Sequence, residues 1–185
     1  YYKVYLADHD ITAEITPADR AAAMRFTYPA GETSAVVIDA YDGGSYIRIL
    51  PELHSVVLYF TKKCGGVPEN FRNWFVIRFD KAFESMMLYD GPEKGIGEAL
   101  EFEGEHVLAS VGFRTRRNET VNVHTASSFI SLEQAWLNLE EVGEKSFDEV
   151  TADAKDRWNE VLSRIQVGGG SEEQFRTFYS CLYRA

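Results

Sequence analysis

The sequence predicts a mainly β protein, an antiparallel β-sandwich followed by helices in the last third of the chain. Short runs of alternating apolar and polar residues recur about every 8 to 12 residues, separated by Gly, Pro, Asn and Asp, as in sandwiches and barrels. No helical pattern stands between these runs, which argues against a parallel sheet with crossover helices. After residue 130 the apolar spacing changes from two to three and four, which indicates helices.

The strands are predicted from period-two alternation, and turn residues mark their ends. Pro17 ends the second run, Pro29 ends the third, and Asp42, Gly43 and Gly44 together have the composition of a turn. The predicted strands cover residues 2–6, 11–15, 24–28, 35–38, 46–50, 56–61, 74–79, 106–114 and 120–126.

Three helices are predicted from serines that are followed three residues later by Gln or Glu, the pattern of a capping box. Residues 168–170 are glycines that separate the second helix from the third. The capping pairs are Ser131 with Gln134, Ser146 with Glu149, and Ser171 with Gln174. The apolar positions at helical spacing are Leu132, Ala135, Trp136 and Leu139; Phe147, Val150, Ala154, Trp158, Val161 and Ile165; and Phe175, Phe178, Tyr179 and Leu182.

These patterns predict a β-sandwich domain over residues 1–130, helices over 131–170, and a further helix over 171–185. The chain opens at Tyr1 inside an apolar alternation and closes at Ala185 inside a helical pattern. We therefore expect it to be a piece of a longer protein, with a sandwich that is incomplete at its N-terminus.

Charge and composition narrow the classes of partner. The 185 residues carry a formal net charge of −10, which repels phosphate backbones and anionic lipid, so we expect neither nucleic acid nor membrane as a partner. No apolar stretch approaches the roughly 18 residues of a spanning helix. Two cysteines, Cys64 and Cys181, do not make a disulfide framework. The 10 Tyr, 12 Phe and 3 Trp suit sheet faces and also stacking on sugars.

Local motifs identify no active site. Asp8, His9 and Asp10 are adjacent, so on a strand they would point to opposite faces and could not converge on one ion; a solvated loop fits better. The histidines lack metal-ligand spacing, and the paired glycines 43–44, 65–66 and 95–97 read as turns. The histidines are His9, His54, His106 and His124.

Carboxylates are abundant, and a glycosidase needs two of them on either side of one bond. Sequence spacing across an all-β body does not give their separation, and a solvated strand face is the simpler reading of each. The candidates are Glu14, Asp19, Asp39, Asp42, Glu69, Asp80, Glu101 and Glu103.

Several segments, in order along nearly the whole chain, resemble the bacterial α-mannosidases of glycoside hydrolase family 92. Residues 14–21 (EITPADRA) and 25–29 (RFTYP) are similar to one stretch of that family. Residues 65–71 (GGVPENF) and 75–83 (FVIRFDKAF) are similar to a loop and the strand after it, with Ala82 where proline is usual. The junction between sandwich and helices in that family is similar to residues 127–135 (SSFISLEQA) with Asn138-Leu139. The linker and the first helix of its catalytic domain are similar to Phe147-Asp148, Trp158-Asn159 and Ile165, followed by residues 176–179 and 182–184.

The resemblance implies a supersandwich-like β-sandwich joined by linker helices (131–170) to an (α/α)6 catalytic barrel whose first helix is 171–185. It implies a calcium-dependent, inverting exo-α-mannosidase of bacterial carbohydrate metabolism, periplasmic or secreted, that acts on mannose-containing glycans. The acid, the base and the calcium ligands would belong to the barrel, and a sugar-contacting Trp segment would precede Tyr1. No catalytic or metal residue is therefore assigned in this chain, and its carbohydrate contacts stay unassigned. We expect the chain alone to be inactive and to bind no Ca2+.

Two readings from other classes stay open. The chain could be a non-catalytic carbohydrate-binding module, with Trp74 or tyrosines stacking on sugar, or a structural module that supports a partner. The apolar stripe of the last helix, formed by Phe175, Phe178, Tyr179 and Leu182, must also be covered. We expect the sandwich or a second copy of the chain to cover it, or else the segment to fray.

Overall fold

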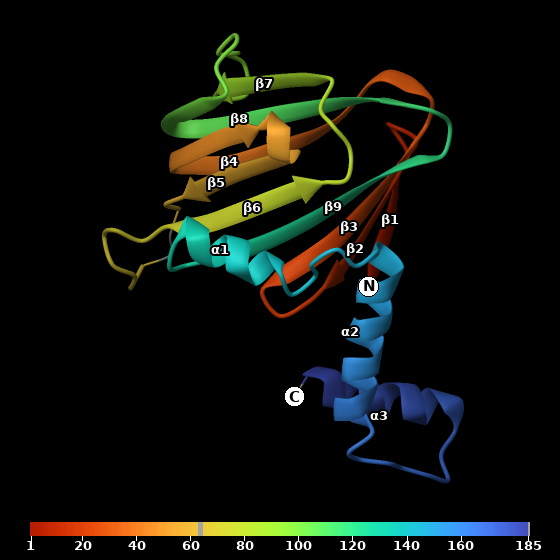
Figure 1. Cartoon of the computed structure of the whole chain (residues 1–185). Helices are drawn as coiled ribbons and strands as arrows, with labels where there is room; N and C mark the ends of the chain where they lie inside the picture. Colours follow the sequence, from red (N-terminus) through yellow and green to blue (C-terminus); the bar gives the residue numbers. More distant parts are fainter. Residues whose placement is uncertain (63–64, 185) are drawn as a thin grey trace.

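The computed structural model describes residues 1–62 and 65–184 and shows a curved antiparallel sheet with helices at one end (Figure 1). All nine strands in this part of the chain belong to one sheet, in the order β1-β2-β3-β9-β6-β5-β4-β8-β7. The strands are β1 (Tyr2–Leu6), β2 (Ile11–Pro17), β3 (Ala21–Tyr28), β4 (Gly31–Leu50), β5 (Ser55–Phe60), β6 (Asn73–Phe79), β7 (Ser85–Asp90), β8 (Glu101–Thr115) and β9 (Glu119–Ser128). The helices are α1 (Leu132–Leu139), α2 (Phe147–Leu162) and α3 (Glu172–Arg184), with a short 3-10 turn at Pro51–Leu53.

The main core lies on one face of this sheet. Side chains from β3, β4, β5, β6, β7, β8 and β9 meet there in a single buried cluster, so the sheet curves over its own apolar face as the layers of a sandwich do. Its largest fully buried members include Phe113, Ile47, Ile49 and Leu88. The predicted mainly β, antiparallel sandwich with C-terminal helices is confirmed.

A second core lies on the opposite, outer face of the sheet, beneath α1. Small residues of β3 and β9, including Ala23 and Ala126, let α1 approach closely, and Ala135 and Leu139 of α1 pack on them. The cluster continues through Phe147 and Val150 at the start of α2. Only part of the outer face is covered in this way, and the uncovered part carries the site described below.

The turn predicted at residues 42–44 is wrong, because β4 runs without interruption through Gly31–Leu50. Its register against β8 shifts at Asp39/Asp42 and again at Asp42/Ser45, where three residues of β4 span two of β8. These are β-bulges, which absorb extra residues and bend a strand without ending it. Tyr41 has a positive φ of 64° in the first of these bulges, and Gly43 and Gly44 supply positive φ angles in the second.

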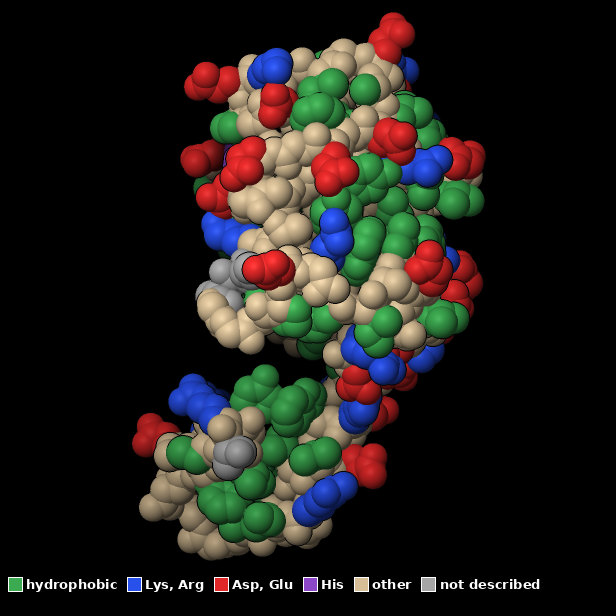
Figure 2. Space-filling model, turned by 90° about the vertical axis from the view of Figure 1, so that its left-hand side faces the viewer, with side chains coloured by type: hydrophobic (Ala, Val, Ile, Leu, Met, Phe, Trp, Pro, Cys, Tyr) green, Lys and Arg blue, Asp and Glu red, His purple; other side chains and the backbone are tan. Residues whose placement is uncertain are grey.

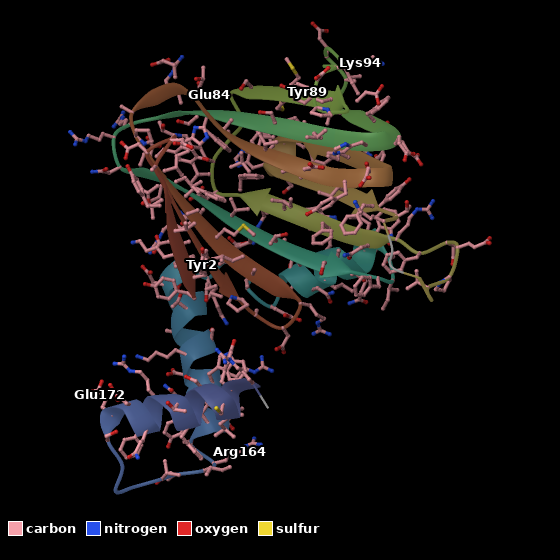
Figure 3. All side chains as sticks on the ribbon, turned by 180° about the vertical axis from the view of Figure 1, so that it is seen from behind. Tyr2, Glu84, Tyr89, Lys94, Arg164 and Glu172 are labelled. Atoms are coloured by element: carbon pink, nitrogen blue, oxygen red, sulfur yellow. The ribbon has the colours of Figure 1, made fainter. Side chains whose placement is uncertain are left out.

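The alternation in the sequence predicts no strand at β7 and a start of β8 at residue 106, whereas the structure has β7 at Ser85–Asp90 and begins β8 at Glu101. The run SMMLYD of β7 has no clear alternation, yet it pairs with β8 from Ser85↔Gly112 to Asp90↔Val107. In the view from behind, Glu84, Tyr89 and Lys94 mark this edge, at the end of the molecule away from Arg164 and Glu172 (Figure 3). The glycines at 95–97 lie in the loop between β7 and β8, as a hairpin turn requires.

The helices begin where their caps predict. Ser146 and Glu149 form a complete capping box, and Ser171 and Gln174 bond each other's backbone N–H groups in the same reciprocal way. The first pair is different: Ser131 Oγ accepts from the Gln134 backbone, but the Gln134 side chain donates to Asn138 instead.

The helices α2 and α3 form a helical unit that projects from the sheet, with Trp158 of α2 against Tyr183 of α3 at a ring-centroid distance of 4.5 Å. No residue of α3 is fully buried. No helix in the described part of the chain is both long and apolar enough to span a membrane. Cys181 is exposed with a free thiol, and Cys64 lies outside the described residues.

Candidate functional site: a polar cleft at the start of α2

The cleft lies on the outer face of the sheet, between the first turn of α2 and the 3-10 turn, and encloses about 850 Å³. Its floor follows from strand alternation: Val121 and Val123 of β9 face the main core, so Thr120, Asn122 and His124 face outward. Arg25 and Thr27 of β3 lie beside them in register with Asn122 and Thr120. This part of the outer face is therefore polar, whereas the part beneath α1 is apolar.

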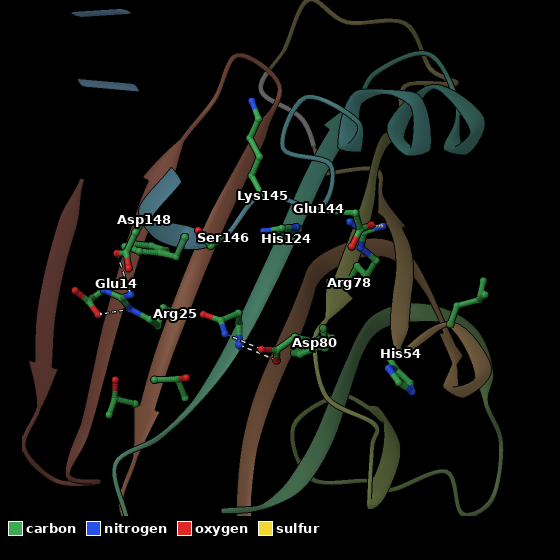
Figure 4. A pocket seen from close by; sticks show the side chains of 16 residues that line it. Glu14, Arg25, His54, Arg78, Asp80, His124, Glu144, Lys145, Ser146 and Asp148 are labelled. Atoms are coloured by element: carbon green, nitrogen blue, oxygen red, sulfur yellow. Dashed lines mark hydrogen bonds and ion pairs between the residues drawn. The ribbon is translucent and has the colours of Figure 1, made fainter. Parts of the chain in front are cut away.

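Arg25 is the most connected side chain of the cleft (Figure 4). Its Nε donates to Glu14 Oε2 at 2.9 Å, its Nη1 donates to Asp148 Oδ1 at 3.1 Å, and its guanidinium lies 4.4 Å from the centre of the Phe147 ring. Glu14 is only 6% exposed, and the hydrogen bond from Arg25 lowers the pKa of its carboxyl. Lys3 lies 3.5 Å from the same carboxylate.

Arg78 holds the opposite wall. Its Nη2 donates to the backbone oxygen of Gly143 at 2.5 Å, and its Nη1 lies 3.2 Å from Glu144 Oε1. His124 is half-buried nearby, and burial, followed by the charge of Arg78, lowers the pKa of its imidazole. In the centre, Asp80 accepts from the backbone and the side-chain amide of Asn122 at 2.9 and 2.6 Å.

This arrangement suits binding and anchoring rather than acid–base chemistry. A glycosidase acid must keep its proton near neutral pH, so its pKa is raised. The pKa of Glu14, the buried carboxylate of the cleft, moves the other way because Arg25 stabilises its charged form. The carboxylates of Asp80 and Asp148 are also engaged with neighbouring donors.

Of the eight carboxylates singled out in the sequence, the cleft brings together two, Glu14 and Asp80. Five others are engaged elsewhere, and Glu69 is exposed. The five pairs are Asp19 with Arg157, Asp39 with His106, Asp42 with Lys62, Glu101 with Tyr46, and Glu103 with Tyr59.

The calcium implied by the resemblance does not fit the residues present. Among residues 1–62 and 65–184, no three His, Cys, Asp or Glu side chains come together as a metal site. Asp8, His9 and Asp10 lie in the exposed turn between β1 and β2, where Asp10 accepts from the Tyr5 hydroxyl at 2.8 Å. We assign no metal ligand to these residues and derive no step through calcium.

Trp74, the candidate for stacking on sugar, is half-buried. Its ring packs against the core beneath α1 and lies 4.8 Å from the Tyr59 ring, nearly edge-on. Tyr59 in turn stacks on Tyr46. The rings of this row contact each other across β4, β5 and β6.

The sequence analysis did not single out Arg25, Arg78, Asn122 or Asp148. Alternation along β3, β6 and β9 does place the first three opposite the main core, and this signal was available. Arg78 bonds Gly143 in the segment before α2, 65 residues away in sequence, and Arg25 bonds Asp148 in the first turn of α2, 123 residues away; alternation says nothing about that docking.

Sequence and structure comparisons agree with this fold. The sequence model of the glycosyl hydrolase family 92 N-terminal domain matches residues 1–128, and that of the family 92 catalytic domain matches residues 134–185. No curated protein sequence matches the chain.

Solved structures of this family superpose closely. A family GH92 inverting mannosidase from Bacteroides thetaiotaomicron, BT2199, is 34% identical with a TM-score of 0.92, over 99% of this chain and 25% of that one. The GH92 α-mannosidase BT3965 of the same organism is 23% identical with a TM-score of 0.86, over 98% and 26%. Its complex with mannoimidazole gives a TM-score of 0.80 at 23% identity, over 91% and 23%.

The chain thus spans about a quarter of the length of the solved enzymes it matches. Its first 128 residues match the family's N-terminal domain model, and nearly all of it superposes on a family member at 34% identity. By these matches the chain belongs to glycoside hydrolase family 92.

Proposed function

We propose that the chain is the sandwich and linker part of a larger α-mannosidase, a calcium-dependent exo-enzyme that hydrolyses α-mannosides of glycans with inversion. The observation that carries the proposal is the 34% identity, over 99% of this chain, to an enzyme described as an inverting mannosidase. The complex of BT3965 with mannoimidazole supports a mannose-configured substrate. A periplasmic or secreted location is proposed with it, because extracellular glycans are the expected substrates.

In an inverting hydrolysis a general acid protonates the leaving oxygen while a general base activates water on the opposite face of the sugar. No residue of this chain is assigned to either role. The part proposed for the chain is mechanical: the sandwich holds the segment that leads into the helical unit, through the contacts of Arg25 and Arg78.

The test compares the intact protein that contains this chain with residues 1–185 alone, on an aryl α-mannoside with calcium or with a chelator. We expect calcium-dependent release of the phenol by the intact protein, with β-mannose as the first product seen by NMR, and no turnover by residues 1–185. We also expect no saturable calcium binding by residues 1–185 in isothermal titration.

Each part of the proposal can fail separately. An intact protein that ignores α-mannosides contradicts the substrate, and α-mannose as first product contradicts inversion. Full activity in chelator contradicts the calcium requirement. Turnover by residues 1–185 above a buffer blank would show that the acid and base lie within them.

A further inference from the structure

Three arginines of the sandwich hold the segment that joins α1 to α2. Arg20 donates to Glu141 from Nε at 2.5 Å and from its backbone N–H at 2.8 Å. Arg78 bonds Gly143 and Glu144, and Arg25 bonds Asp148 in the first turn of α2. These arginines come from the β2–β3 turn, β6 and β3, so the segment is tied to the sheet at separate points.

Arg25 differs from the other two because it contacts α2 itself. Its guanidinium bridges the carboxylates of Glu14 and Asp148 while it lies over the ring of Phe147, the first residue of α2. Phe147 is buried, and the ring of Tyr1 meets it edge-on at 6.3 Å. A planar fork that bonds two carboxylates and stacks on an aromatic ring is a task for arginine and not for lysine.

Beyond its first turn, α2 has few anchors. Phe147 and Val150 are its buried residues, and both lie near its start. Two ion pairs lie farther along. Arg157 Nη2 lies 2.9 Å from Asp19 Oδ2, between side chains that are 66% and 56% exposed, and Lys145 Nζ lies 2.8 Å from Asp153 Oδ2, between side chains that are 48% and 60% exposed. Exposed pairs of this kind contribute little.

The direction of α2 is therefore set near one end. The helix has 16 residues, which at 1.5 Å per residue is about 24 Å long. A small rotation of the helix about Phe147 therefore displaces its far end much more than its first turn. We propose that Arg25 is the positioning residue that sets the direction of α2, and with it the placement of the helical unit relative to the sheet.

The proposal uses the proposed function only in treating α2 as the route into the catalytic domain. Its test measures geometry and not activity, so a failure of the mannosidase assignment would leave it unaffected, and the reverse also holds.

The test is a distance measurement by pulsed electron paramagnetic resonance between spin labels at Val37→Cys on β4 and Lys155→Cys on α2, with Cys64 and Cys181 replaced by serine. Val37 is 65% exposed and Lys155 is exposed, so the labels disturb no packing. The main variant is Glu14→Gln with Arg25→Met, which removes both charges of this pair together, so that the buried Glu14 carboxylate is not left without Arg25. Arg25→Lys keeps the charge without the fork, and Arg157→Met is the matched control.

We expect one narrow distance peak for the parent chain and for Arg157→Met. We expect a broadened, shifted distribution for the double variant and for Arg25→Lys, with amide exchange of the sheet and of α2 as in the parent. A parent-like peak in the double variant overturns the proposal. A parent-like peak in Arg25→Lys overturns the role given to the guanidinium fork, because a positive charge at this position would then be enough to set the direction of α2. Equal broadening by Arg157→Met, or unfolding of α2 or the sheet in the double variant, also overturns it, because Arg25 would then not act by orienting α2.

Discussion

Glu14 and Arg25 face each other across β2 and β3 as directly paired residues, and both point away from the main core. Their alternation with core residues places them on the outer face, where a carboxylate and a guanidinium would ordinarily be solvated. The arrival of Phe147 and Asp148 covers them, so Glu14 becomes buried and its charge depends on Arg25. A solvated strand side chain thus becomes an anchor for the helix.

Replacement of Glu14 by Gln should destabilise the chain at neutral pH and flatten its acid dependence. The carboxyl pKa is lower folded than its ordinary 4.5, so its stabilisation is complete above that value and is lost as pH falls through the folded pKa. Urea unfolding at pH 7 should show a loss of about 1–3 kcal/mol, because Arg25 loses a charged acceptor. Between about pH 5 and pH 3 the variant should lose less stability than the parent.

Glu52→Gln is the control, since this carboxylate is exposed on the 3-10 turn. Its effect should stay within about 0.5 kcal/mol. If Glu14→Gln behaves like Glu52→Gln at both pH values, the bond from Arg25 does not stabilise the fold.

For single residues, the sequence predicts which face of the sheet a side chain lies on, but not which side chain it contacts there. It named Glu14 and Asp80 as carboxylates of strands or their ends, and both lie in the cleft. It could not find Asp148 as a partner of Arg25, because that contact joins residues 123 apart in sequence and requires α2 already docked.

At the scale of elements, β4 shows why composition misjudged a turn. Asp42, Gly43 and Gly44 are turn residues by type, and positive φ is what such residues supply. Here β8 pairs with β4 on both sides of them, at Asp39↔Leu108 and Ser45↔Gly104, so the backbone bulges and continues. The same residue types favour a bulge and a turn, so the sequence of one strand does not distinguish them. The pairing of the neighbouring strand on both sides of the segment does.

Gly43→Ala and Gly44→Ala should both destabilise the chain, and Gly44→Ala should do so more. Their φ angles are 93° and 100°, which an L side chain tolerates at a cost of about 1–3 kcal/mol. A Cβ on Gly43 meets nothing within 4 Å, whereas one on Gly44 lies 2.9 Å from Thr61 Oγ1. The Thr61 side chain cannot rotate away from this Cβ without a loss, because its hydroxyl donates to the carbonyl oxygens of both glycines.

The measurement is urea unfolding of both variants, with and without Thr61→Ala. Removal of the hydroxyl should bring the cost of Gly44→Ala down to that of Gly43→Ala. Equal costs for the two glycines in the parent background would show that the contact with Thr61 is relieved without penalty.

The helices were easier to predict than the strand ends because their signals are local. Serine caps at 146 and 171 each bond a residue three positions away, so neither needs a distant partner. The missed β7 has the opposite character: its run is short and is held by pairing with β8.

At the scale of the whole molecule, the helical unit carries apolar surface that the sandwich does not cover. Figure 2 shows hydrophobic side chains gathered on this unit and a hollow between it and the sandwich. The stripe of Phe175, Phe178, Tyr179 and Leu182 is half-buried, in part against α2. Outside it, large apolar side chains stay exposed: Trp158, Val161, Ile165, Val167 and Tyr183.

We predict that the chain self-associates through this surface. Full burial of each large apolar side chain is worth about 1.5–3 kcal/mol, and a second copy could supply it. Light scattering after gel filtration should give a dimer or larger species for the parent chain. The double variant Ile165→Lys with Tyr183→Lys should be monomeric, because it places two charges within the surface.

A matched control separates the position of the charges from their number. Val37→Lys with Leu53→Lys adds the same charge at exposed apolar positions of the sandwich, 65% and 52% exposed, and should associate like the parent. A chain ending at Gly170 is the less direct comparison, because loss of α3 also removes the Tyr183 ring from Trp158. Monodisperse monomers for the parent and both double variants would show that the helical unit keeps its apolar side chains in water without a partner copy.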